Sequence, residues 1–116
     1  MEVQIVKDKI TRNELAKIAK NQFGDMVKAV VDLKQEIMAV GGELHADEEA
    51  VLNEKCGSKR EDVWGVNLYP EKPENEWVEF SSMINIKPHL GNRSRGVEDP
   101  EIQIKIKNVI KKLVAY

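Results

Sequence analysis

The chain has 116 residues, of which 41% are hydrophobic and 33% are charged. This length matches one domain and leaves no room for a second core of useful size. The hydrophobic share is too high for a disordered chain. The sequence therefore predicts one folded domain over residues 1–116.

The formal net charge of −2 is unevenly distributed along the chain. Residues 32–79 carry five Lys or Arg against thirteen Asp or Glu, whereas residues 80–116 carry seven against three. An acidic middle and a basic end could complement each other within one fold or between two copies of the chain. The sequence lacks the strong basic stripe of nucleic-acid-binding proteins, which argues against that class.

The first ten residues include Glu2, Lys7, Asp8 and Lys9, so they lack the unbroken apolar run of a signal peptide or a membrane span. The single cysteine, Cys56, cannot form an internal disulfide or a multi-thiolate metal site. We therefore expect a cytoplasmic protein that does not contact the membrane.

The N-terminal part of the chain predicts a short strand over residues 3–7 and a helix that begins after Thr11. Thr11 and Glu14 have the spacing of a capping box, in which each side chain accepts a hydrogen bond from the backbone amide of the other. Gly24 follows the apolar face of this helix and is a typical stop signal.

Two apolar runs, residues 26–31 and 37–40, flank a polar connection and predict a β-hairpin. Asp47 is then the expected N-cap of a second helix, because the following acidic residues suit the positive end of a helix dipole. Gly57 is the expected end of this helix.

A second hairpin is predicted from residues 63–69 and 77–86, which are separated by a turn-rich segment. Alternation along these strands places one apolar face against the core. The opposite face is polar and is expected to face solvent, as one side of an antiparallel sheet often does. It includes Asn67, Glu79 and Ser81.

The last helix is predicted to begin with Asp99 as N-cap and Pro100 at the first helical position. The resulting order of elements is βαββαββα, in which hairpins rather than crossovers join the strands. This order favours an α+β fold: a mainly antiparallel sheet of four or five strands, with about three helices packed on one face.

Four stretches of the sequence, residues 24–32, 41–49, 64–70 and 91–100, resemble a family of small prokaryotic proteins that is catalogued only as a domain of unknown function. The resemblance covers nearly the whole chain. Lys87 stands at a place that we associate with arginine in this family, which puts a bidentate contact there in doubt. The resemblance implies a single domain and no particular chemistry.

The motifs of several large enzyme classes are absent from the sequence. It contains no G-x-x-x-x-G-K-[ST], G-x-G-x-x-G, G-x-S-x-G or H-E-x-x-H pattern. This argues against nucleotide-loop enzymes, serine hydrolases of the elbow type and zincins.

Glu43, His45 and Asp47 are the first candidate site, because three ionisable side chains alternate and would share one side of an extended segment. A histidine between carboxylates suits general base catalysis or a divalent metal, and His89 could complete a set of two histidines and a carboxylate. The alternative is structural: Asp47 caps the helix, Glu43 is solvated and His45 bonds the backbone.

The second candidate site is the loop over residues 91–96, which combines two guanidiniums, two small polar side chains and two glycines. These are the groups that bind a phosphate or a carboxylate. Alternatively, its arginines could tie the loop to internal carboxylates such as Glu43 or Glu79. The candidate binding residues are Asn92, Arg93, Ser94 and Arg95.

Together these residues favour a small enzyme or ligand-binding protein that acts on an anionic small molecule, such as a phosphate or a carboxylate. The alternative is a homo-oligomeric or partner-binding module without catalytic activity, which would use an uncovered sheet face or edge. A nucleic-acid binder would instead gather Lys28, Lys87, Arg93, Arg95 and the lysines near the C-terminus on one surface. The sequence defines no cofactor and no metal requirement.

Overall fold

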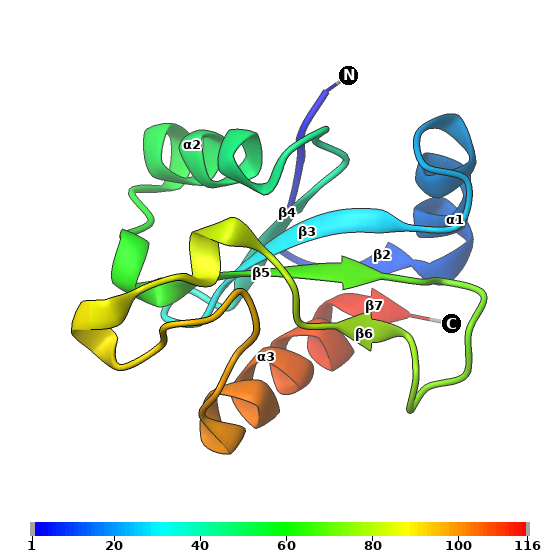
Figure 1. Cartoon of the computed structure of the whole chain (residues 1–116). Helices are drawn as coiled ribbons and strands as arrows, with labels where there is room; N and C mark the ends of the chain where they lie inside the picture. The colour runs from blue at the N-terminus through cyan, green and yellow to red at the C-terminus, as the bar shows by residue number, and fades with distance from the viewer. Residues whose placement is uncertain (1, 116) are drawn as a thin grey trace.

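A five-stranded antiparallel sheet forms the centre of the computed structural model, which describes residues 2–115. Its strands are β1 (Gln4–Val6), β3 (Val27–Asp32), β4 (Ile37–Val40), β5 (Val63–Leu68) and β6 (Val78–Glu79). They stand in the order β1-β4-β3-β5-β6 (Figure 1). The middle strands β3 and β5 pair along their whole length. The α+β fold and the mainly antiparallel sheet are confirmed.

The helices cover both faces of this sheet. Helices α1 (Arg12–Asn21) and α3 (Pro100–Leu113) pack on one face, and α2 (His45–Cys56) packs on the other (Figure 1). The expectation of helices on one face is wrong, because the central strands carry apolar side chains on both sides. On β3, for example, Val31 belongs to the α3 side and Val30 to the α2 side.

Two short parallel strands that the sequence did not indicate join the beginning and the end of the chain. Strand β2 (Ile10–Thr11) leads into α1, and β7 (Val114–Ala115) follows α3. Their pairing holds these two helices on the same side of the sheet. No helix in the described part of the chain is long and apolar enough to cross a bilayer.

The predicted starts of α1 and α3 are confirmed. The Thr11 hydroxyl accepts a hydrogen bond from the Glu14 amide at 3.0 Å, and the Glu14 carboxylate accepts one from the Thr11 amide at 3.1 Å. At α3, the Asp99 carboxylate accepts a hydrogen bond from the Glu101 amide at 2.8 Å, with Pro100 as the first helical residue. Both signals are local, so the sequence shows them directly.

Helix α2 begins earlier than predicted. Its N-cap is Leu44 rather than Asp47, which lies inside the first turn. The earlier start gives α2 an inward face formed by His45, Glu48 and Leu52, all of which are buried. The predicted end is confirmed, because Gly57 follows the helix in the left-handed conformation, with a φ of 66°.

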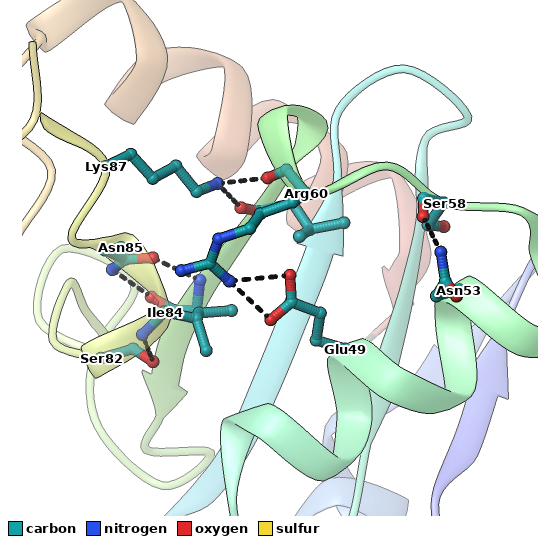
Figure 2. A network of polar contacts seen from close by, with 10 residues as sticks. Glu49, Asn53, Ser58, Arg60, Ser82, Ile84, Asn85 and Lys87 are labelled. Atoms are coloured by element: carbon teal, nitrogen blue, oxygen red, sulfur yellow. Dashed lines mark hydrogen bonds and ion pairs between the residues drawn. The ribbon is translucent and has the colours of Figure 1, made fainter. Parts of the chain in front are cut away.

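The second hairpin forms, but its last strand is shorter than the predicted segment 77–86. Within that segment only Val78 and Glu79, which form β6, pair with β5. Beyond them, Asn85 replaces the missing strand: its Oδ1 accepts from the Gly65 amide at 2.8 Å and its Nδ2 donates to the Gly65 carbonyl at 2.9 Å. Figure 2 shows this amide beside Ser82 and Ile84, in a short 3-10 turn over Met83–Asn85. The Asn85 side chain thus holds this segment beside the edge of β5 where no strand pairing is present.

Candidate functional site

A pocket of about 550 Å³ opens on the α2 side of the sheet, between the first turn of α2, the central strands and the segment after β6. Its lining includes two cationic side chains and no carboxylate. The polar lining residues are Lys28, His45, Asn67, Ser81, Ser82 and Arg95. The pocket therefore joins His45 and one residue of the 91–96 loop, which the sequence treated as two separate candidates.

His45 lies at the start of α2 with one edge of its ring against β5. Its Nε2 is 2.9 Å from the Val66 carbonyl oxygen, and a carbonyl only accepts, so Nε2 carries a hydrogen. Gly65 makes room for this edge: a Cβ there would lie 3.2 Å from His45 Cδ2 and 2.6 Å from Ser82 Oγ. Nδ1, at the vertex opposite the Cδ2–Nε2 edge, points away from the strand.

The surroundings of His45 keep its ring neutral. Burial lowers the pKa of the imidazole below its ordinary value of 6.5, and the nearby charges of Lys28 and Arg95 lower it further. The hydrogen bond to Val66 and the Asn67 side chain act in the opposite direction and only partly offset this effect. At neutral pH, Nδ1 therefore has a free lone pair that can accept a proton.

Ser82 is poorly placed to act as a nucleophile activated by His45. Its hydroxyl lies beside Gly65, at the point that the Cδ2 edge of the imidazole also approaches. The lone pair is on Nδ1, at the opposite side of the ring. The arrangement therefore lacks the hydrogen bond from hydroxyl to base that a serine–histidine pair requires.

Asn67 contributes a buried acceptor without a partner. The residue is only 8% exposed, and its Nδ2 donates to Glu79 Oε1 at 2.8 Å. Its Oδ1 is buried beside the His45 ring and completes no hydrogen bond with residues 2–115. Such an atom costs about 1–3 kcal/mol. This oxygen would accept a hydrogen bond from the neighbouring His45 ring in its protonated form, which is why the Asn67 side chain raises the pKa of that ring.

The N-terminus of α2 opens into the same pocket without a cap. Leu44, at the N-cap position, has an apolar side chain and supplies no hydrogen bond. The Asp47 amide donates to the Leu44 carbonyl at 3.1 Å, but within residues 2–115 nothing accepts from the His45 and Ala46 amides. These free amides carry the positive end of the helix dipole, which favours an anion.

Arg95 is held at the pocket through its backbone. Its carbonyl accepts hydrogen bonds from the Ser82 amide at 2.9 Å and from Asn85 Nδ2 at 3.0 Å. Its guanidinium is exposed and makes no ion pair with the described residues. Lys28 of β3 is half-buried and likewise makes no ion pair with the described residues; its ammonium lies 5.3 Å from the centre of the Phe23 ring.

The other residues of the 91–96 loop lie outside this pocket. Asn92 is buried, and its Nδ2 lies within hydrogen-bonding distance of the carbonyl oxygens of Asn85, Ser94 and Gly96. The amides of Arg93 and Ser94 both donate to one oxygen of Glu98, at 2.8 and 2.9 Å.

These bonds lower the pKa of the Glu98 carboxyl. The loop amides therefore hold an internal carboxylate, and of the four candidate residues only Arg95 reaches the pocket. Neither arginine forms the expected alternative ion pair with Glu43 or Glu79. Ligand roles for Asn92, Arg93 and Ser94 stay predictions.

Glu43 and Asp47 are exposed and do not line the pocket, so their catalytic roles stay predictions. The carboxyl group that does turn inward beside His45 is Glu48. Its Oε2 accepts from the Gly42 amide at 2.9 Å, and its buried Oε1 has no partner among residues 2–115. Burial raises the pKa of this carboxyl well above 4.5.

The metal set of His45, His89 and Glu43 is not assembled. His89 is exposed in a 3-10 turn over Pro88–Leu90, whereas His45 is buried under the first turn of α2. Within residues 2–115, no three His, Cys, Asp or Glu side chains lie close enough to hold one metal ion.

A family model described as "Protein of unknown function (DUF5674)" matches residues 4–113. The chain belongs to this family. The match confirms the resemblance seen in the sequence, and it includes every residue that lines the pocket. Comparisons with curated proteins and with solved structures gave no significant match.

Lys87 of the DUF5674 chain serves the fold rather than the pocket. It is fully buried, its Nζ donates to the Arg60 and Val63 carbonyls, and it lies 4.1 Å from the centre of the Trp64 ring. Burial lowers its pKa to about 8. Figure 2 shows that Arg60 in turn reaches Glu49 of α2, with two hydrogen bonds of 3.0 and 3.2 Å. Together they tie α2 to the segment before β5.

Sequence reasoning missed two features of the pocket. It assigned Asn67 and Ser81 to an exposed sheet face, whereas the start of α2 covers that face. It also left His45 and Glu48 out of the inward side of α2, although their spacing with Leu52 is helical. The detectable signal was a polar residue within an apolar strand, as with Lys28 in β3 and Asn67 in β5.

Proposed function

We propose that this DUF5674 protein binds a small anionic molecule in the pocket at the start of α2. The observation that carries the proposal is the uncapped end of α2, whose first residues His45 and Ala46 line a pocket with two cations and no carboxylate in its lining. A capping side chain or a salt bridge would already have satisfied these groups in a purely structural arrangement.

The polar groups of the pocket have two different roles in this proposal: one set binds the anionic group of the ligand, and the other exchanges a proton with the ligand. The amides of α2, with Arg95 and Lys28, would surround the anionic group. The Nδ1 atom of His45 is available for proton exchange with the ligand. We propose binding as the main function, because the lining offers His45 no activated nucleophile and the described residues offer no metal cluster.

Isothermal titration of the full chain with inorganic phosphate and with benzoate tests the proposal. Arg95→Ala should weaken anion binding about 10-fold or more, since a charge-assisted hydrogen bond contributes roughly 1.5–3 kcal/mol. Arg93→Ala is the matched control, because it removes the same charge from the same loop outside the pocket. Its affinity should stay within about twofold of the wild type, as expected for a distant, screened charge.

Two results would contradict the proposal. One is equal weakening by both variants, which would mean a nonspecific charge effect. The other is the absence of saturable binding by every anion tested. Circular dichroism of Arg95→Ala should match the wild type, because the contacts that hold residue 95 involve its backbone carbonyl and not its side chain.

A further inference from the structure

We infer that the anion is a phosphomonoester whose phosphate lies at the start of α2 and whose organic part is apolar. This inference rests on the proposed function and specifies its ligand. It follows from the charge of the pocket, from the directions of its donors and from the side chains at its rim.

Charge balance favours a dianion. Lys28 and Arg95 supply two positive charges that form no ion pair with a described carboxylate, and the end of α2 adds about half a charge. A phosphomonoester carries about −1.5 to −2 at pH 7, whereas a carboxylate carries one negative charge and would leave a cation unpaired. Asp47 is exposed in the first turn of α2 and lies outside the lining.

The residues that carry potential donors come to the pocket from three separate elements. His45 and Ala46 belong to α2, Lys28 to β3, and Arg95 to the loop before α3. A tetrahedral group with three free oxygens can accept from all three directions. A planar carboxylate has only two oxygens in one plane, which the fork of one arginine satisfies.

Asn67 links the anion to the protonation state of His45. Its buried Oδ1 is an unpaired acceptor beside the His45 ring. A dianion in the pocket would offset the repulsion that Lys28 and Arg95 exert on a protonated ring, and Oδ1 would then stabilise the imidazolium. The acceptor that the free protein leaves unused gains a role in the complex.

The rim of the pocket indicates the nature of the organic part. Leu44 and Met83 line it and are 56% and 64% exposed, although large apolar side chains are normally covered. Met26 adds a second thioether to the lining. Methionine side chains adapt to irregular apolar surfaces and contact aromatic rings favourably. An aromatic group attached to the phosphate would cover this surface.

Four probes test the inference in titrations of the full chain: phenyl phosphate, benzoate, inorganic phosphate and a short phosphotyrosine peptide. Phenyl phosphate should bind at least 10-fold more tightly than benzoate and than inorganic phosphate. Met83→Ser should reduce the preference for phenyl phosphate over inorganic phosphate by at least threefold, while Leu90→Ser, at an exposed site outside the pocket, should not change it.

Each outcome has a defined meaning. Benzoate binding as tightly as phenyl phosphate, or inorganic phosphate doing so, would overturn the inference but leave the anion-binding function intact. No binding of any probe would overturn both. Tighter binding of the peptide than of phenyl phosphate would support the inference with a phosphorylated protein as the source. Weaker binding of the peptide would support it with a free small molecule.

Discussion

The imidazole of His45 donates a hydrogen bond from Nε2 to the Val66 carbonyl oxygen, 2.9 Å away on the neighbouring strand β5. This bond selects the tautomer of the ring and leaves Nδ1 as the atom that can bind a proton. It also attaches the first turn of α2 to the sheet, so a change at His45 affects both the pocket and the fold.

The first prediction concerns acid stability. Because the pKa of His45 is lowered in the folded protein, the unfolded chain binds more protons as the pH falls below about 6.5. The contribution of His45 to stability is therefore complete above pH 6.5 and decreases below it. His45→Gln keeps an amide donor for Val66 but cannot titrate. Urea unfolding between pH 7.5 and 5 should show a smaller loss for the variant than for the wild type, and equal losses would contradict this account.

The second prediction concerns Gly65. An alanine Cβ there would lie 2.6 Å from Ser82 and 3.2 Å from the His45 ring, and both neighbours are held by hydrogen bonds. Gly65→Ala should lower the free energy of unfolding by about 1–3 kcal/mol, as overpacking typically does. Gly96→Ala is the control, since its Cβ would meet only ordinary contacts at 3.6 Å. Urea unfolding of both variants measures the difference, and similar losses would refute the steric explanation.

The third prediction concerns Asn92, whose amide nitrogen faces the carbonyls of Asn85, Ser94 and Gly96. Asn92→Asp places a carboxylate oxygen against these acceptors and should cost more than about 2 kcal/mol, because buried acceptors lose their donor. Ser94→Ala, at an exposed position, should change stability by less than about 0.5 kcal/mol. Thermal and urea unfolding would report both effects, and a stable Asn92→Asp variant would contradict the structural role of this amide.

The fourth prediction concerns alkaline pH. Burial lowers the pKa of Lys87 to about 8, so above that pH the folded protein binds fewer protons than the unfolded chain. Its contribution therefore makes stability rise with pH between about 8 and 10. Lys87→Arg, which stays protonated, and Lys87→Met, which cannot titrate, should both lack this rise. Urea unfolding at pH 7.5, 8.5 and 9.5 tests this, and a wild type that shows no rise relative to both variants would disprove it.

The parts of the fold that the sequence predicts are those with local signals. Thr11 with Glu14, and Asp99 with Pro100, define helix starts within a few residues, and Gly57 defines a helix end. These signals depend only on backbone groups nearby in sequence. The start of α2 lacks such a signal, because its N-cap is an apolar leucine.

The features that the sequence could not predict depend on contacts between distant residues. Asn85 replaces a strand partner for Gly65, twenty residues away, which propensity does not reveal. The Arg95 side chain reaches the pocket because its carbonyl is bound by Ser82 and Asn85. The sequence contained both candidate sites, but only the packing of the loop against β5 brings His45 and Arg95 together and leaves Arg93 outside.

The carboxylate of Glu98, held by the Arg93 and Ser94 amides, has an evolutionary consequence. The Glu98 carboxylate occupies the two amide donors of this turn, which have the geometry to bind the anionic group of a separate molecule. Replacement of Glu98 by alanine, a single-nucleotide change, would vacate those two donors while the bonds of Asn92 continue to shape the loop. The fold thus lies one substitution from a second candidate anion site, in the same loop that carries Arg95, and gene duplication followed by divergence would allow the two copies to differ there.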